Sequence, residues 1–351
     1  MGKLCVFKYV SFMLLIVTTL TATFTIFGLF GGTVDPASGT AMAMLVYALP
    51  FLLGADVILL IYWAIRRKWH WMAIPAISLL CSIPYISPVY QPGFFHSGET
   101  SRSGIKISSY NVAMFSRETS GFKSQDILAE MKKQGVDILC FQEYENTRGD
   151  KLNSDSYKTY FPYLATGRSD MVIYSRYPIE RHDIIDFGNT NNSAMWADVN
   201  VNSRIIRVFN CHLETTGFNR ALHQLAKGQL QGHSIEDNAI IRTIYGNYTR
   251  GMAVRARQAD MVAELIKSSE YPVIVCGDFN DVPYSYVYNT MLGDLVDGFR
   301  ECGKGTMYTY TGKKKVRIDY IFHDERFEGE SYYTKELTYS DHYPVFTKIA
   351  F

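Results

Sequence analysis

The 351-residue sequence lacks an excess of charge, a paired-cysteine motif and an internal repeat. Its 35 Lys and Arg balance 34 Asp and Glu, whereas a protein that binds nucleic acid mainly through bulk charge is clearly basic. The six cysteines form no CxxC pair or metal-ligand spacing, and Cys140, Cys211 and Cys276 lie in apolar, strand-like runs typical of core residues. These absences disfavour a zinc or dithiol site, a solenoid and a bulk-charge nucleic-acid binder.

Charges are almost absent from the first quarter of the chain, and this absence favours a membrane-anchored protein over an entirely soluble one. Three long apolar runs predict transmembrane helices at about 9–30, 41–65 and 69–88. A cleaved signal peptide is the alternative for the first run, but that run is too long for a signal core and two more follow. The prediction is therefore a membrane anchor over 1–88, a Pro-, Gly- and Ser-rich linker over 89–104 and a polar domain over 105–351.

The positions of the short-loop cations predict the orientation of this anchor. Lys3 and Lys8 precede the first run and Arg66–Lys68 follow the second, while the loop between these runs carries Asp35 and no cation. The positive-inside rule then places both basic segments in the cytoplasm. With three spans, the polar domain is expected outside the cytoplasm, tethered to the inner membrane by a multi-pass anchor.

One acid, Asp56, interrupts the second apolar run. It is either a functional intramembrane carboxylate or a hydrogen-bonded group packed against a neighbouring helix, and the second interpretation is favoured.

In the polar domain, buried strands end repeatedly at chemically active residues. The stretch Tyr271–Asn280 (YPVIVCGDFN) reads as a strand apolar on both faces that ends at Asp278 and Asn280. Strands alternate with helices in the first half and hairpins follow later, which indicates a mixed-sheet α/β sandwich. A carboxylate at the end of a buried strand is costly unless a metal, a water or a phosphate compensates it.

Seven motifs in order resemble the endonuclease/exonuclease/phosphatase superfamily, which has the deoxyribonuclease-I-like fold. The resemblance covers about residues 105–351 and no part of the anchor. It implies a four-layered α/β sandwich of two mixed β-sheets flanked by helices. The motifs are SYN at 109–111, QE at 142–143, SRYP at 175–178, HL at 212–213, GDFN at 277–280, RIDYIF at 317–322 and SDHYPV at 340–345.

The resemblance also implies roles for the strand-end residues. Glu143, with Asn111 and Asp341, offers the hard oxygen ligands that suit Mg²⁺ or Mn²⁺. Asp319 is expected to hold His342 as a histidine–carboxylate pair. The full expected catalytic set is His212, Asp278, Asn280, Asp319 and His342, in which Asp278 activates the attacking water and Asn280 and His212 donate to phosphate oxygens.

Some of these residues also have an ordinary structural interpretation. Asn111 and Asn280 occur at positions where turn residues are common, and His212 could be a satisfied core histidine. Lys315 belongs to a charged hairpin tip just before the strand that carries Asp319. It is expected to touch a substrate phosphate. The candidate substrate-binding residues are Arg176, Lys315 and Arg317.

The predicted function is metal-dependent hydrolysis of a phosphoester, most simply a phosphodiester of nucleic acid or of a phospholipid headgroup. The alternative is a membrane-tethered binding scaffold that keeps the fold without catalysis. The complete residue set disfavours the scaffold, because lost catalysis is expected to leave gaps at Glu143, Asp278 or His342. The predicted partners are the substrate and the membrane; no protein partner is inferred.

Overall fold

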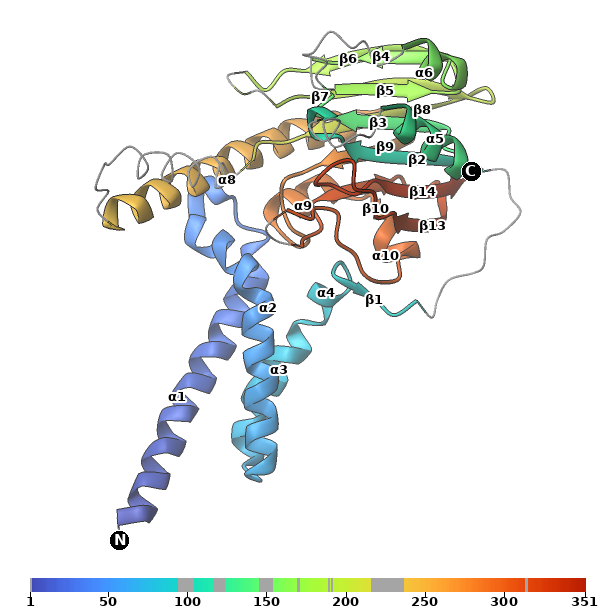
Figure 1. Cartoon of the computed structure of the whole chain (residues 1–351). Helices are drawn as coiled ribbons and strands as arrows, with labels where there is room; N and C mark the ends of the chain where they lie inside the picture. Colours follow the sequence, from blue (N-terminus) through green and yellow to red (C-terminus); the bar gives the residue numbers. More distant parts are fainter. Residues whose placement is uncertain are drawn as a thin grey trace. The chain divides into compact units, whose positions relative to one another are not determined.

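A computed structural model gives the fold of the chain (Figure 1). The chain divides into two compact units, residues 1–88 with 284–289, and residues 89–283 with 290–351. The residues that the structure describes are 2–93, 104–115, 124–144, 154–168, 171–188, 190, 192–215, 237–312 and 315–351.

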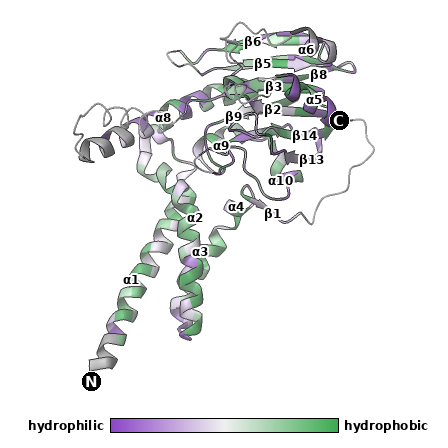
Figure 2. Ribbon diagram, in the orientation of Figure 1, coloured by the Kyte–Doolittle hydropathy of each residue, from purple (hydrophilic) through white to green (hydrophobic). Residues whose placement is uncertain are grey.

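Two long apolar helices dominate the first unit, α1 (Gly2–Gly31) and α2 (Pro36–Ile65). The side chain of Asp35 caps α2 by accepting a hydrogen bond from the backbone N–H of Ala37 at 2.8 Å. Pro36 suits the first turn because that turn needs no N–H donor. The shorter helices α3 (Trp69–Cys81) and α4 (Ile83–Ile86) follow. Apolar residues predominate along α1, α2 and α3 (Figure 2).

The prediction of three spanning helices is wrong in number. Within the described residues, only 7–31 and 36–65 form helices long and apolar enough to cross a membrane. The third run instead gives α3, whose 13 residues rise about 20 Å, against a hydrocarbon core of about 30 Å. The helix stops there because Pro84 has no N–H to continue the hydrogen-bond ladder.

This correction removes the support for an extracytoplasmic domain. The expected orientation depended on three crossings after a cytoplasmic N-terminus. With two helices long and apolar enough to cross a membrane among the described residues, that count no longer holds.

The second unit is an α/β sandwich of two mixed six-stranded sheets with helices. The β9 sheet has the order β10 (Val296–Asp297), β12 (Asp319–His323), β9 (Val273–Asp278), β8 (Arg204–His212), β7 (Ala194–Val201) and β6 (Ile179–Ile185). The β2 sheet has the order β13 (Glu328–Thr334), β14 (Val345–Ala350), β2 (Gly104–Asn111), β3 (Ile138–Gln142), β5 (Met171–Ser175) and β4 (Tyr163–Thr166). A short ribbon joins β1 (Tyr90–Gln91) to β11 (Gly305–Thr306).

Each sheet has one parallel pair, β8 with β9 and β2 with β3, and its other pairs are antiparallel. The two parallel pairs matter most for function, because parallel neighbours bring their carboxyl ends to the same edge of a sheet.

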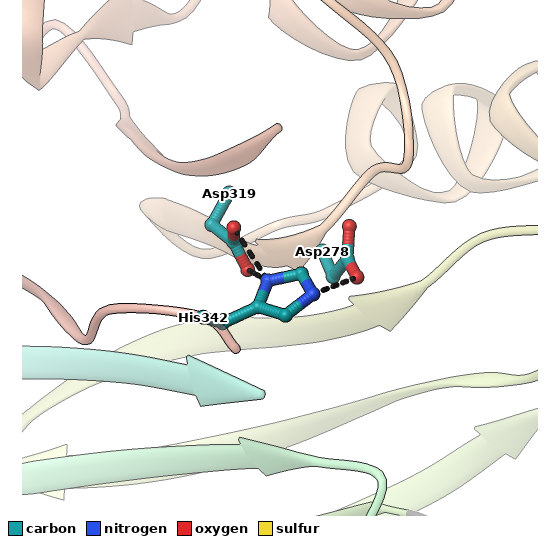
Figure 3. A group of neighbouring side chains, drawn as sticks. All are labelled: Asp278, Asp319 and His342. Atoms are coloured by element: carbon teal, nitrogen blue, oxygen red, sulfur yellow. Dashed lines mark hydrogen bonds and ion pairs between the residues drawn. The ribbon is translucent and has the colours of Figure 1, made fainter. Parts of the chain in front are cut away.

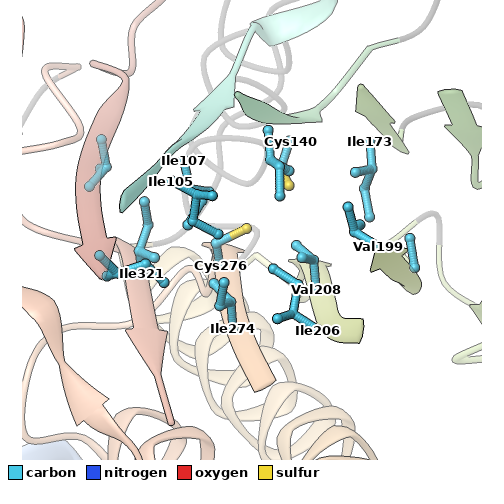
Figure 4. Close-up of a cluster of buried hydrophobic side chains, with 14 of the residues drawn as sticks. Ile105, Ile107, Cys140, Ile173, Val199, Ile206, Val208, Ile274, Cys276 and Ile321 are labelled. Atoms are coloured by element: carbon cyan, nitrogen blue, oxygen red, sulfur yellow. The ribbon is translucent and has the colours of Figure 1, made fainter. Parts of the chain in front are cut away.

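Aliphatic side chains fill the space between the sheets (Figure 4). Ile107 and Cys140 from the β2 sheet pack in one cluster with Val208, Ile274 and Cys276 from the β9 sheet, and all five are fully buried. The thiols are free, so the prediction that Cys140, Cys211 and Cys276 are core residues is confirmed.

Helices cover the outer faces of the sandwich. α5 (Ser124–Gln134) and α6 (Ser154–Tyr160) bury Met131 and Tyr157 in an aromatic cluster with Phe141 of the β2 sheet. The part of the chain that the structure describes also contains the 3₁₀ turn η1 (Ala113–Phe115) and the helices α8 (Asp237–Lys267), α9 (Tyr286–Leu292) and α10 (Gly298–Cys302). Residues 216–236, which precede α8, lie outside the described residues.

Candidate active site

The inward-facing residues of the strands change from apolar to polar toward one edge of the sandwich. Along β8, Ile206 and Val208 belong to the core, and Asn210 and His212 follow them on the same face, because alternate residues of a strand share a face. β9 shows the same change and ends at Asp278.

Strand pairing brings the predicted residues together at this edge. His212 pairs with Asp278 across the parallel strands β8 and β9, and Asp319 pairs with Asp278 across β12 and β9. On the other sheet, Asn111 pairs with Gln142, the residue before Glu143. Strands whose site residues are as far apart in sequence as Asn111 and Asp319 therefore meet at one edge.

Gly277 permits the close approach of β8 and β9 just before Asp278. Its φ is +135°, and a Cβ atom there would lie 1.9 Å from the carbonyl oxygen of Cys211. No other residue type fits this position without moving the backbone.

His342 lies between two carboxylates (Figure 3). Its Nδ1 is 2.9 Å from Oδ2 of Asp319, and its Nε2 is 3.7 Å from Oδ2 of Asp278. All three side chains are buried. The predicted histidine–carboxylate contact between His342 and Asp319 is present.

The pKa values of this group follow from burial and charge. Burial of His342 by itself lowers its pKa, but the charges of Asp319 and Asp278 and the hydrogen bond to Asp319 outweigh it and raise the pKa to about 10. Burial and the charge of Asp319 raise the pKa of Asp278 to about 6, against the opposing charges of His342 and His212. At neutral pH the structure therefore favours a cationic His342 beside a mostly ionised Asp278.

Asn111 connects the two sheets at the site. Its amide donates hydrogen bonds to Glu143 Oε1 at 3.1 Å and to Asp278 Oδ2 at 3.0 Å. Nε2 of His212 lies 3.6 Å from the same Glu143 oxygen. Glu143 has a φ of +49°, which ends the strand alternation and allows its carboxylate to reach Asn111 and His212. Left-handed backbone at a non-glycine residue costs about 1–3 kcal/mol and is common at functional sites.

Asn280 and Asp341 lie beside this group. The backbone N–H of Asn280 donates to Asp278 Oδ1 at 2.8 Å, while its side chain donates to the carbonyl of Leu213 at 2.9 Å. The charge of Asp341 contributes to the raised pKa of His342.

Two of the three predicted substrate-binding residues do not reach the site. Arg176 pairs with Asp137 at 2.7 Å, and because β5 runs antiparallel to β3 it lies at the edge opposite Glu143. Arg317 is buried in an ion pair of 2.5 Å with Asp297, with its guanidinium between the rings of Phe299 and Tyr320. Both residues belong to motifs, SRYP and RIDYIF, but their side chains pair with Asp137 and Asp297.

Lys315 instead lines a cavity of about 510 Å³, together with Lys304, Tyr308, Thr311 and Tyr343. None of the predicted catalytic or metal residues lines this cavity. Two of its lining residues are neighbours of the site: Tyr343 follows His342, and the backbone N–H of Thr311 donates to the carbonyl of Asp341 at 2.8 Å.

Sequence reasoning missed the residues that hold the acidic and basic groups in place. The hydroxyl of Thr309 accepts from the backbone N–H of Asp319 at 3.0 Å, and the ring of Tyr310 lies 5.0 Å from the ring of His342. The hydroxyl of Ser340 donates to the carbonyl of Asn111 at 2.8 Å. Only Ser340 lies in a motif, and the hairpin that carries Thr309 and Tyr310 has no sequence signal for this role.

The donor set fits a hard divalent cation better at Glu143 than at the histidine. Ligand atoms of Asp278, Asp319 and His342 lie within 4.8 Å of one another, but the Asp319–His342 hydrogen bond already uses one of the nitrogens and one carboxylate. The Glu143 carboxylate is about one-third exposed and stands beside an amide, which matches the oxygen chemistry that Mg²⁺ and Mn²⁺ prefer. Glu143 and Asn111 are therefore the residues best suited to hold the metal.

A family model described as "Endonuclease/Exonuclease/phosphatase family" matches residues 108–342, a range that runs from the strand of Asn111 to His342. The chain belongs to this family. Members typically bind a divalent metal, which agrees with the acidic site of this family member. A second model, of a domain of unknown function, matches residues 11–89. A search of curated proteins gave no match.

Solved structures support the same fold for this family member. TDP2 from D. rerio, in a complex with single-strand DNA product, is 16% identical with a TM-score of 0.51, over 71% of this chain and 100% of that one. An endonuclease/exonuclease/phosphatase family protein from Bacteroides thetaiotaomicron is 18% identical with a TM-score of 0.50, over 72% and 99%. One from Bacteroides vulgatus is 15% identical with a TM-score of 0.51, over 71% and 99%. At these identities the likeness establishes the fold alone.

Proposed function

We propose that the protein is a divalent-metal-dependent phosphoester hydrolase, acting on the phosphodiester bonds of nucleic acid or of a phospholipid headgroup. The observation that carries the proposal is His342, held by Asp319 at 2.9 Å and placed 3.7 Å from Asp278. The pKa values of His342 and Asp278 are displaced so that one group carries a proton at pH 7 and the other accepts one, which is how acid and base roles separate in a single site.

Each residue then has a chemical task in the hydrolysis. Asp278 accepts the proton of the attacking water, since a base with a pKa near 6 is mostly ionised at neutral pH and still binds a proton well. The cationic His342 donates to a phosphoryl oxygen, where negative charge grows in the transition state. Asp319 fixes the ring orientation and keeps His342 protonated. His212 and Asn280 are the further donors proposed for the phosphate oxygens.

A Mg²⁺ or Mn²⁺ ion held by Glu143 and Asn111, with Asp341 as a further oxygen donor, supplies charge neutralisation at the phosphoryl group when bound. Lys315 is the remaining proposed substrate contact, and its place in the cavity beside Tyr343 supports that role.

The test is hydrolysis by the full chain in detergent. The panel is bis-p-nitrophenyl phosphate, p-nitrophenyl phosphate, single-stranded DNA, plasmid DNA, RNA and sphingomyelin, each with Mg²⁺ or Mn²⁺ and with EDTA. We expect metal-dependent turnover of at least one diester that EDTA abolishes. Hydrolysis that survives chelation, or no hydrolysis of any substrate, would overturn the proposal and favour the binding scaffold.

We also propose that α1 and α2 anchor the protein in the inner membrane with the sandwich on the cytoplasmic side. The two-helix count supports this orientation, together with the basic residues Lys3, Lys8 and Arg66–Lys68. The substrate is then a phosphoester that meets the cytoplasmic face of the membrane.

A further inference from the structure

A polar layer lies directly beneath the candidate site, between the two sheets. Its members are Ser109 of β2, Gln142 of β3 and Asn210 of β8, and each is fully buried. The layer separates the aliphatic core from the site residues above it.

The hydrogen bonds of this layer join the two sheets. The amide of Gln142 donates to Oδ1 of Asn210 at 2.7 Å and to the hydroxyl of Ser109 at 3.1 Å. In return, the amide of Asn210 donates to the backbone carbonyls of Phe141 at 2.9 Å and Val172 at 3.1 Å. One side chain of the β9 sheet therefore contacts β3 and β5 of the β2 sheet.

The site above this layer is divided between the same two sheets. Glu143, the proposed metal ligand, follows Gln142 on the β2 sheet, whereas His212, two residues after Asn210, belongs to the β9 sheet. At site level the hydrogen bond of 3.0 Å from Asn111 to Asp278 and the 3.6 Å approach of His212 to Glu143 cross the gap. Aliphatic packing is non-directional and does not fix such a separation to a few tenths of an ångström, whereas hydrogen bonds do.

The layer also lowers the free energy of unfolding compared with an apolar core of the same volume. Among the described residues, Oε1 of Gln142 has no hydrogen-bond partner although it is buried, and such an orphan acceptor costs about 1–3 kcal/mol. An apolar pair of similar volume avoids this cost, so folding stability alone does not account for the layer.

We infer that Gln142 and Asn210 are positioning residues that fix the spacing between Glu143 on one sheet and His212 and Asp278 on the other. The inference rests on the proposed function, because it concerns the metal and phosphoryl geometry of that site. Groups that orient metal ligands from behind typically change metal affinity or activity by about 10–100-fold when removed.

The test compares the double variant Gln142→Leu/Asn210→Leu with the unmodified full chain in detergent. Mn²⁺ binding is measured by electron paramagnetic resonance, hydrolysis on the best diester of the panel, and thermal unfolding by circular dichroism. We expect about tenfold or greater weakening of Mn²⁺ binding and a similar loss of kcat/KM, with an unfolding temperature unchanged or raised.

Val208→Ala is the matched control, since Val208 lies two residues from Asn210 on the same face of β8 and packs only in the aliphatic core. It should lower the unfolding temperature and leave Mn²⁺ affinity unchanged. If the double variant does not fold, the single variant Gln142→Met takes its place in the same measurements. This variant keeps the hydrogen bonds from Asn210 to the backbone carbonyls.

Unchanged Mn²⁺ affinity and kcat/KM in a folded variant would overturn the inference. An equal loss of affinity in Val208→Ala would do so as well, because it would show a general effect of core destabilisation. If the unmodified protein neither binds Mn²⁺ nor hydrolyses any diester, the proposed function fails instead.

Discussion

In the first unit large apolar side chains face outward, whereas in the sandwich they face inward. Phe24 of α1 is 48% exposed and Phe51 of α2 is 80% exposed, while Ile107 and Ile274 of the sandwich are fully buried. A surface of this kind is stable in lipid and costly in water. The two units therefore bury their apolar side chains in opposite ways, which supports the proposed membrane anchor.

The two units also bury their carboxylates differently. Asp56 of α2 accepts hydrogen bonds from the hydroxyls of Thr25 at 2.8 Å and Ser78 at 2.7 Å, and it thereby joins α1, α2 and α3. Asp319 in the sandwich faces His342 instead. Both bonds go to Oδ2 of Asp56, and among the described residues its buried Oδ1 has no hydrogen-bond partner. A carboxylate bonded by neutral hydroxyls holds helices together, and one facing a titratable ring can move a proton. This agrees with the interpretation of Asp56 as a packed, hydrogen-bonded group.

The largest predicted difference between the units is that the first lies in the membrane and the sandwich lies in water. The full chain should remain in the membrane fraction after alkaline carbonate extraction. A C-terminal green fluorescent protein fusion should be bright and a C-terminal alkaline phosphatase fusion inactive, because two crossings return the chain to the cytoplasm. An active phosphatase with a dark fluorescent fusion would show a third crossing and restore the extracytoplasmic placement.

The next largest effect is expected from substitution of the buried acid and base residues of the sandwich. His342→Ala and Asp278→Asn should each lower kcat by about 10²–10⁴-fold, since each removes a proton transfer or a charge contact in the transition state. His182→Ala is the control, because His182 lies exposed on β6. Near-normal turnover of Asp278→Asn would show that another group activates the water.

Removal of the proposed metal ligand should have an intermediate effect. Glu143→Ala should raise the Mg²⁺ concentration needed for half-maximal activity by about 10–100-fold, with a smaller loss of rate at saturating metal. A titration of rate against Mg²⁺ measures both. An unchanged metal requirement would instead assign the ion to the Asp278, Asp319 and His342 group.

The pH profile should reveal the burial of Asp278. The water-activating form is ionised, and burial raises its pKa to about 6, so protonation should remove activity as the pH falls through 6. The expected profile of kcat/KM falls about tenfold per pH unit below that value. A profile that stays flat down to pH 4 would mean that Asp278 keeps an ordinary carboxyl pKa or plays no part as a base.

The smallest effect is expected in the first unit. Asp56→Leu should destabilise the helices by about 1 kcal/mol, since hydrogen bonds between membrane helices contribute about 0.6 kcal/mol on average. Thr19→Val is the matched control, because Thr19 bonds only within its own helix. Tryptophan fluorescence follows the unfolding, as three of the four tryptophans lie in this unit. A loss of hydrolysis in Asp56→Leu would give Asp56 a function beyond packing.

Much of the sandwich and most of its site could be predicted from the sequence. The apolar run before Asp278 and the polar residues at the other strand ends are local signals, because a buried strand is continuous in sequence and its end is marked by the first chemically active residue. This signal predicts Asn111, Glu143, His212, Asp278 and Asp319, and His342 is predicted as a residue just before the last strand. The structure brings these six to one edge of the sandwich.

Only the tertiary structure decided which neighbours of those motifs face the site. Arg176 and Arg317 belong to motifs, yet the antiparallel direction of β5 takes the first to the opposite edge and Asp297 holds the second in the interior. The contacts of Gln142 and Asn210 between the sheets were equally out of reach. Strand direction and contacts between sheets depend on partners that are distant in sequence, whereas a run of apolar residues shows only which segments can be buried.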